Sequence, residues 1–362
     1  MSTKPNILVT SAAGKTGLHV VLQLREKGFP VRAFIRKRDH RSDLLAEAGA
    51  ELFEGNQYAI TDMRRAIEGM QRAYQCAPTA PNGLHFSAVF TAAAHEARLE
   101  HVVTLGQWLT AADHPSLFTR EVYLADHLAD LSPHTSVTKV NPGWFADNYM
   151  MGLGLAAQLG LFAMPLGAGD QAKNAAPSNE DIARVVVAAL TDPARHAGKS
   201  YRPTGQKLTS PNEIAETMGR VLGHRVRYMD VSQNMMVKAL RAWPPANYSE
   251  AAVSQLAIYA EEYRRGTFAI NAPTEDVEAV TGQKPKSLEE IVAQAVAAQP
   301  AMRRKWLRRA SGLAAFAKVL LTPRLDLQRV QQDRDYVTLS APRFSQDCAE
   351  WRAHHHPSPP TH

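Results

Sequence analysis

Short apolar runs alternate with longer stretches of helical spacing along residues 6–145. Three to five consecutive apolar residues bounded by Gly or Pro predict buried strands, and apolar residues three or four apart predict helices. The predicted strands are 6–10, 31–35, 50–53, 73–76, 101–105 and 136–140, and the predicted helices are 17–27, 44–48, 61–70, 86–97 and 119–131. This alternation indicates an α/β domain built on a doubly wound parallel sheet.

The pattern changes after residue 145. Residues 150–169 are apolar but hold five glycines, which favours a loop or broken helix. Helices are predicted further along at 179–190, 211–222, 247–266 and 287–298. We therefore expect a sheet domain over residues 1–150, to which later segments can return, and a smaller, mostly helical domain over 151–300.

Residues 301–362 have a different character, that of a basic C-terminal tail. They hold eleven Lys/Arg and five Asp/Glu, which accounts for the whole formal charge of +6, so no nucleic-acid-binding surface is expected. Over 301–321 one helical face carries Met302, Trp306, Ala310, Leu313, Ala317 and Leu320. This basic amphipathic pattern suits a membrane surface or a protein partner, and a helix docked on the protein's own body is the alternative. Beyond Pro323 the polar chain is predicted to be disordered.

A glycine turn joins the first predicted strand to the first helix. It reads Thr10-Ser-Ala-Ala-Gly-Lys-Thr-Gly17, with Ser11 in place of the first glycine of a dinucleotide-binding fingerprint. Gly14 would let a pyrophosphate approach the backbone, and Gly17 would let the helix pack on the strand. An ordinary tight turn is the alternative. A nucleoside-triphosphate P-loop is excluded, because Val9 stands where that motif needs a glycine.

Arg36 ends the second strand, about twenty residues after the turn. An acidic residue at this point would bind the ribose hydroxyls of NAD, whereas an arginine suits the 2′-phosphate of NADP. Lys37 and Arg38 add positive charge, and the first acidic residue is Asp39. A solvated basic loop is the alternative interpretation.

Together these motifs resemble the NmrA-like family of atypical short-chain dehydrogenases/reductases. The resemblance covers roughly residues 6–298 and departs from the family at Ser11 and at Asn56, where aspartate is frequent. The motifs that carry it are the turn Thr10–Gly17, the strand Val31–Arg36, the strand end Gly55-Asn56, the segment Pro142-Gly-Trp-Phe-Ala-Asp-Asn148 and the signature Thr281-Gly-Gln-Lys-Pro-Lys-Ser287.

The resemblance implies a Rossmann domain that binds NADP(H), with a small C-terminal substrate domain. The cofactor would be held by Thr10, Ser11, Gly14, Lys15, Thr16, Gly17 and Arg36, and by the strand ends Ala77-Pro78 and Leu105-Gly106-Gln107. Trp144, Phe145 and Asn148 would face the substrate. The family includes reductases of quinones and dyes, and also members that sense the redox state of the cofactor without useful turnover.

The usual proton donor of short-chain dehydrogenases is missing. None of the ten tyrosines is followed four residues later by lysine, the partner that lowers the tyrosine pKa. Tyr123 and His127 lie one helical turn apart and would form a donor pair, or would simply pack the helix. No pattern of metal ligands is found, so we expect no metal. The two cysteines suit a reducing, cytoplasmic compartment.

Two functions remain open at this point. The first is an NADPH-dependent reductase that transfers a hydride to a conjugated, aromatic acceptor such as a quinone. The stretch 152–169 would then close over the acceptor. The alternative is a non-catalytic NADP(H)-binding regulator that acts through a protein partner. The oligomeric state does not follow from the sequence.

Overall fold

The computed structural model describes residues 4–78, 82–244, 249–299, 309–334 and 336–355. Its centre is a seven-stranded sheet in the order β3-β2-β1-β4-β5-β6-β8, in which every pairing is parallel. The strands are β1 Ile7–Val9, β2 Val31–Ile35, β3 Glu51–Glu54, β4 Arg72–Gln75, β5 His101–Leu105, β6 Ser136–Val140 and β8 Ser200–Tyr201. The strand order reverses direction at β1, so a crevice opens there at the carboxyl edge.

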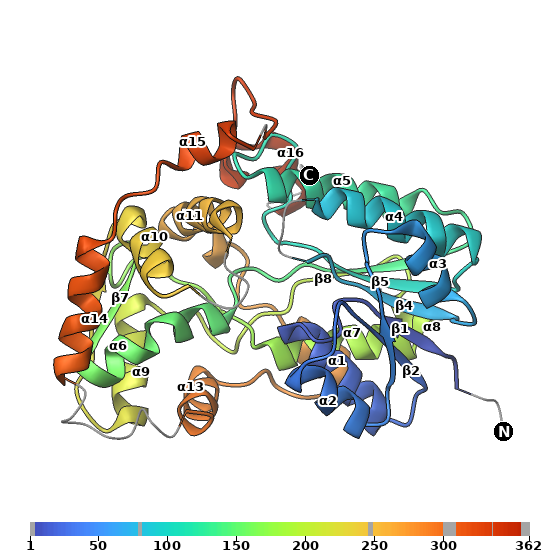
Figure 1. Ribbon diagram of the computed structural model, residues 1–362, viewed down its shortest axis with the longest axis horizontal. Helices are drawn as coiled ribbons and strands as arrows, with labels where there is room; N and C mark the ends of the chain where they lie inside the picture. The colour runs from blue at the N-terminus through green and yellow to red at the C-terminus, as the bar shows by residue number, and fades with distance from the viewer. Residues whose placement is uncertain (1–3, 79–81, 245–248, 300–308, 335, 356–362) are drawn as a thin grey trace, which may run out of the picture.

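Helices cover both faces of the sheet (Figure 1). Their bounds are α1 Lys15–Glu26, α2 His40–Glu47, α3 Ile60–Ile67, α4 Gly83–Glu96, α5 Leu117–Asp130, α7 Asn179–Thr191, α8 Pro193–His196 and α12 Asp276–Thr281. Alternate residues of each strand enter different cores, because successive strand side chains point to opposite faces. Tyr74 and Val103 pack in the core that includes α1 and α7, whereas Ala73 and Val102 pack in the core that includes α3 and α4.

The segment 179–201 returns to this sheet after the chain has left it. It forms α7, which packs beside α1, and β8, which pairs with β6. The sheet domain is thus completed by residues well beyond position 150. This closes the β6 edge, where backbone groups would otherwise lack partners.

A smaller domain packs at the carboxyl end of the sheet (Figure 1). It is mostly helical, as expected, but it also contains a two-stranded parallel sheet that we had not predicted. Its elements are η1 Ala146–Gly152, α6 Leu153–Leu159, β7 Leu161–Met164, α9 Pro211–Leu222, β9 Arg227–Asp230, α10 Gln233–Ala242, α11 Glu250–Arg264, η2 Thr267–Ala269 and α13 Leu288–Ala297.

Residues 152–169, for which we expected a loop or broken helix, form regular elements up to residue 164. This stretch forms the end of η1, then α6 and β7, and Phe162 in β7 is fully buried. Gly152 is needed for packing, since a Cβ there would lie 2.7 Å from the Phe162 ring. Gly160 and Gly167 instead have φ values of 69° and 88°, in the left-handed region that favours glycine.

The prediction of disorder beyond Pro323 is also wrong for the residues that the structure describes. After α14 (Arg309–Leu321), which packs against α6 and α10, the chain forms α15 (Leu327–Gln332), η4 (Ser345–Asp347) and α16 (Ala349–His355). Cys348 and Trp351 are buried in the core of the smaller domain. A few apolar anchors offset the entropy of ordering a polar chain, and composition alone does not reveal them. Of the predicted amphipathic face, Met302 and Trp306 lie outside the described residues, whereas Leu313 and Leu320 are exposed on α14.

Candidate functional site

The glycine turn after β1 holds the backbone in a strained but well-supported shape. Ser11 has a φ of 47°, in the left-handed region that favours glycine. Its amide donates to the Gln57 side-chain oxygen at 3.1 Å, and its hydroxyl donates to the Cys76 carbonyl at 2.8 Å. Two hydrogen bonds to neighbouring strand ends therefore stabilise a serine where the fingerprint has glycine. Gln57 was missed by the sequence analysis, although it follows Asn56 at the end of the third strand.

Gly17 allows the first turn of α1 to lie against this loop. A Cβ on Gly17 would stand 2.4 Å from the Ser11 carbonyl oxygen and 3.1 Å from the Ala12 Cα. At Gly14 the same oxygen would be 2.9 Å away. Real Cβ atoms do not approach backbone so closely, so both positions require glycine for packing within the turn.

The N-terminus of α1 is open to an anion. Gly14 is its N-cap, no side chain caps the helix, and its first turn has no acidic residue. The first amides of a helix have no partner within it and carry partial positive charge. Lys15 adds a cation and lies 3.4 Å from Asp147 as a loose, exposed pair. The arrangement suits a phosphate group.

Two hydroxyls expected to contact the cofactor are already engaged in the protein. Thr10 Oγ1 donates to the Tyr74 carbonyl and accepts from the Cys76 amide, each at 2.9 Å. Thr16 Oγ1 donates to Asn179 Oδ1 at 2.8 Å. These two side chains brace β1 against β4 and α1 against α7. Their contribution to a ligand would come only through the backbone.

Arg36 projects from the end of β2 on the surface of the protein. It is exposed, and within the described part of the chain it makes no hydrogen bond or ion pair, unlike Arg41, which pairs with Asp39 at 2.5 Å. Burial raises the pKa of the nearby Tyr58, and the positive charge of Arg36 opposes that rise. The guanidinium is therefore available to a phosphate beside the Tyr58 ring.

The ends of β5 and β6 present unsatisfied polar atoms. Among the described residues, Gln107 Oε1 and Asn141 Oδ1 are buried without a hydrogen-bond partner. Gly106, between β5 and Gln107, leaves space for the side-chain amide of Asn141. A Cβ on Gly106 would stand 2.1 Å from Asn141 Oδ1. A buried acceptor without a donor costs about 1–3 kcal/mol. Ala77 and Pro78, half-buried after β4, complete this edge.

The Tyr123–His127 pair is directed toward the end of the chain. Tyr123 Oη donates to Glu350 of α16 at 3.0 Å, and the His127 ring lies 4.4 Å from the Tyr123 ring. Burial and the carboxylate of Glu350 raise the pKa of Tyr123. An activated tyrosine acid needs a lowered pKa, so this environment disfavours the proton-donor role and favours the alternative that the pair packs the helix.

The three expected substrate residues do not share one environment. Trp144 is 1% exposed and packs against Tyr263 and Phe268, with ring centroids 5.5 and 6.3 Å away. Its ring therefore has no open face for an acceptor in this structure, which corrects the expectation. Phe145 and Asn148 are half-buried at the start of η1.

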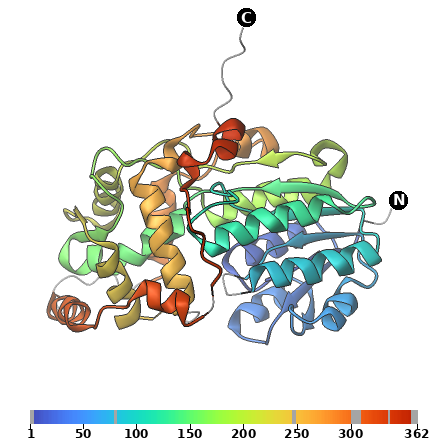
Figure 2. The same ribbon diagram turned by 90° about the horizontal axis from the view of Figure 1, so that it is seen from above.

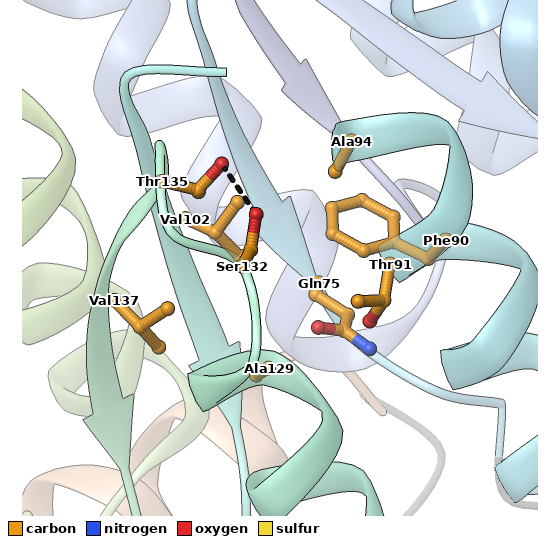
Figure 3. A pocket seen from close by; sticks show the side chains of 9 residues that line it. All are labelled: Gln75, Phe90, Thr91, Ala94, Val102, Ala129, Ser132, Thr135 and Val137. Atoms are coloured by element: carbon orange, nitrogen blue, oxygen red, sulfur yellow. Dashed lines mark hydrogen bonds between the residues drawn. The ribbon is translucent and has the colours of Figure 1, made fainter. Parts of the chain in front are cut away.

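A small pocket lies away from these residues, between α4, α5 and the sheet (Figure 3). Gln75 points into it, and the Gln75 Oε1 atom has no partner among the described residues. None of the residues that line the pocket carries a charge, and none belongs to the predicted site. We regard it as a packing defect in the α4–α5 layer.

The described residues contain no cluster of three or more His, Cys, Asp or Glu side chains arranged to hold a metal ion. No helix among them combines the length and apolar character needed to cross a membrane.

The parallel sheet, the glycine turn and the open helix N-terminus define a Rossmann-type protein whose site fits a dinucleotide. The chain belongs to the NmrA-like family, whose model matches residues 3–292. It is 27% identical over 294 residues to the NAD(P)H azoreductase of Xenophilus azovorans, covering 81% of this chain and 98% of that protein.

Two solved structures are similar in fold. The NADPH-dependent quinone oxidoreductase of Escherichia coli, complexed with NADPH, has a TM-score of 0.68 at 20% identity, over 80% of this chain and 99% of that one. The negative transcriptional regulator NmrA, complexed with NADP, has a TM-score of 0.69 at 16% identity, over 83% and 98%. At these identities the likeness shows the fold alone.

Proposed function

We propose that this protein is an NADPH-dependent reductase of a conjugated, aromatic acceptor such as a quinone or an azo dye. The observation that carries the proposal is the open N-terminus of α1 together with Arg36 at the end of β2, which has no hydrogen bond or ion pair within the described part of the chain. The first would bind the pyrophosphate and the second the 2′-phosphate. The azoreductase relative and the quinone oxidoreductase of similar fold support the choice of acceptor.

When bound, NADPH supplies a hydride. The residues of this chain would orient the cofactor: the amides of Lys15, Thr16 and Gly17 at the pyrophosphate, and Arg36 at the adenosine end. Gln107 Oε1, an acceptor without a donor, would take a hydrogen bond from the nicotinamide amide. Reduction of a quinone-like acceptor depends on close placement beside the nicotinamide more than on a strong acid. The unactivated Tyr123 is compatible with this chemistry.

The test is to mix the purified full chain with NADPH and a panel of quinones, azo dyes and aldehydes, and to follow the nicotinamide absorbance. We expect oxidation with quinones or dyes and none with aldehydes, whose reduction needs an activated proton donor. NADPH binding measured by calorimetry provides the control for a properly folded protein. Tight binding without oxidation of NADPH by any acceptor would overturn the reductase and favour the regulator.

A further inference from the structure

The last residues that the structure describes form a segment that touches both domains. This C-terminal segment, residues 337–355, passes along the boundary between α11 and α5, as Figure 2 shows in dark red. The family match ends at residue 292, so the segment lies outside it. Cys348 and Trp351 nevertheless complete the apolar core that contains Trp108 and Trp144. The burial of these two side chains indicates that the segment is part of the packed fold around Trp108 and Trp144.

The segment makes repeated hydrogen bonds to the loop between β5 and α5. The Arg343 amide donates to the Asp113 carbonyl at 2.8 Å, and Ser345 Oγ donates to the Leu109 carbonyl at 3.0 Å. Trp351 Nε1 donates to the Trp108 carbonyl at 2.9 Å. The C-terminal segment thus donates hydrogen bonds to three backbone carbonyls of the loop between β5 and α5.

The same segment also binds the smaller domain. The Ser345 amide donates to Glu262 Oε1 at 2.7 Å, and Arg265 forms an ion pair with Asp347 at 2.9 Å. Gln346 Nε2 donates to the Arg265 carbonyl at 2.9 Å. Because these contacts and those to the loop come from neighbouring residues, the segment connects the two domains rigidly.

Trp108 is the centre of this connection. Its ring meets the rings of Trp351 and His355 edge-on, at centroid distances of 5.6 and 4.0 Å, and the Arg202 guanidinium lies 3.5 Å from its centroid. Trp108 directly follows Gln107, whose side-chain oxygen is buried without a partner in the described structure. Because the two residues are consecutive, a shift of the Trp108 backbone would also shift Gln107.

We infer that the C-terminal segment positions the loop 107–113 for the reaction, with Trp351 as the main positioning residue. This inference rests on the proposed function, since Gln107 is taken to face the nicotinamide. The segment is hydrogen-bonded to both domains, so the loop is held in place before the substrate binds. Pre-arrangement lowers the entropic cost of binding and of reaching the reactive geometry.

The test compares the full-length Trp351→Ala and Trp351→Phe variants with the wild type. Trp243→Ala provides a matched control, since Trp243 is 55% exposed at the end of α10. Hydrogen exchange of the 107–113 amides is measured together with NADPH affinity and with KM and kcat for a reducible quinone. We expect Trp351→Ala to speed exchange of the loop by about tenfold and to raise KM, with a smaller loss of NADPH affinity because Gln107 is one of several cofactor contacts.

Trp351→Phe keeps a ring but loses the donor to the Trp108 carbonyl, so its effects should be intermediate. It also decides the matter if Trp351→Ala does not fold. Wild-type exchange and wild-type KM in both variants would overturn the inference. If the wild type reduces no acceptor, the proposed function fails, whereas the exchange measurement still shows whether the segment holds the loop.

Discussion

Glu262 Oε1 lies 3.0 Å from His114 Nε2, and both side chains are fully buried between the two domains. The Ser116 amide donates to His114 Nδ1 at 3.0 Å, so the proton of the ring resides on Nε2 and is donated to Glu262. Thr267 Oγ1 and the Ser345 amide donate to the same carboxylate. Donors from three separate segments of the chain therefore converge on one buried anion.

We predict that Glu262→Gln destabilises the protein by about 2 kcal/mol or more. The charge-assisted hydrogen bonds to the carboxylate are lost, and the NH2 group of the new glutamine faces groups that are themselves donors. The Glu261→Gln variant is the control. Glu261 lies on the same helix, in a half-exposed pair with Arg265 that is worth little. Urea unfolding followed by circular dichroism measures both. Equal midpoints for the two variants would contradict a central role for Glu262.

We also predict that the stabilisation from the Glu262 carboxylate is lost at acid pH. Burial alone would raise the pKa of Glu262, but the hydrogen bonds from His114, Thr267 and Ser345 outweigh burial and lower it. A carboxyl with a lowered folded pKa adds stability above its unfolded value, near 4.5, and this stability is lost as the pH falls through the folded pKa. The stability difference between wild type and Glu262→Gln should therefore shrink below about pH 4.5, which thermal unfolding at several pH values would show.

Gly17→Ala should damage the cofactor turn, because the new methyl group would lie 2.4 Å from the Ser11 carbonyl oxygen. We expect a loss of about 1–3 kcal/mol in unfolding free energy together with weaker NADPH binding. Gly154→Ala is the matched control: a Cβ on Gly154, in α6, would meet no atom of the described residues outside its own helix within 4 Å, so alanine should stabilise by about 0.5–1 kcal/mol. A Gly17→Ala variant as stable as wild type would show that the turn can relax.

Arg36→Ala should weaken NADPH binding by about tenfold to a hundredfold while changing NADH binding little, since only NADPH has the 2′-phosphate. Arg65→Ala, which removes an exposed arginine from α3, controls for the loss of charge. Calorimetric titration with both cofactors measures how much each variant weakens NADPH binding relative to NADH binding. Equal losses for NADPH and NADH would remove Arg36 from the site.

Tyr123→Phe should leave turnover with a quinone nearly unchanged. Loss of a general acid costs roughly 10²-fold or more, but the Tyr123 hydroxyl donates to Glu350 and its pKa is raised. Steady-state kinetics across the pH range measures the effect. A hundredfold fall in kcat would instead restore Tyr123 as the proton donor.

Trp144→Ala should lower stability by about 3–5 kcal/mol, because the side chain is buried against Tyr263 and Phe268. A residue that only stacked on an acceptor would change KM without changing stability. Trp243→Ala, at an exposed position, should have little effect. Thermal unfolding of the two variants separates these cases.

Local patterns predicted the sheet well, since each of the six predicted strands is present within one or two residues of its expected bounds. The family motifs likewise pointed to the turn and to Arg36. The environments of Tyr123 and Trp144 were not predictable in this way. The Tyr123 hydroxyl donates to Glu350, which lies 227 positions away. The Trp144 ring is buried against Tyr263 and Phe268.

The sequence by itself determined the α/β alternation and the place of the cofactor turn, because strand length, helical spacing and a βα junction depend on neighbouring residues. Only the tertiary structure decided that the polar C-terminal segment is ordered, that residues 153–164 form a packed helix and strand, and that Gln57 supports Ser11. Each of these depends on contacts between residues far apart in the chain. Whether such contacts offset the entropy of ordering a segment is settled by the packing of the whole fold.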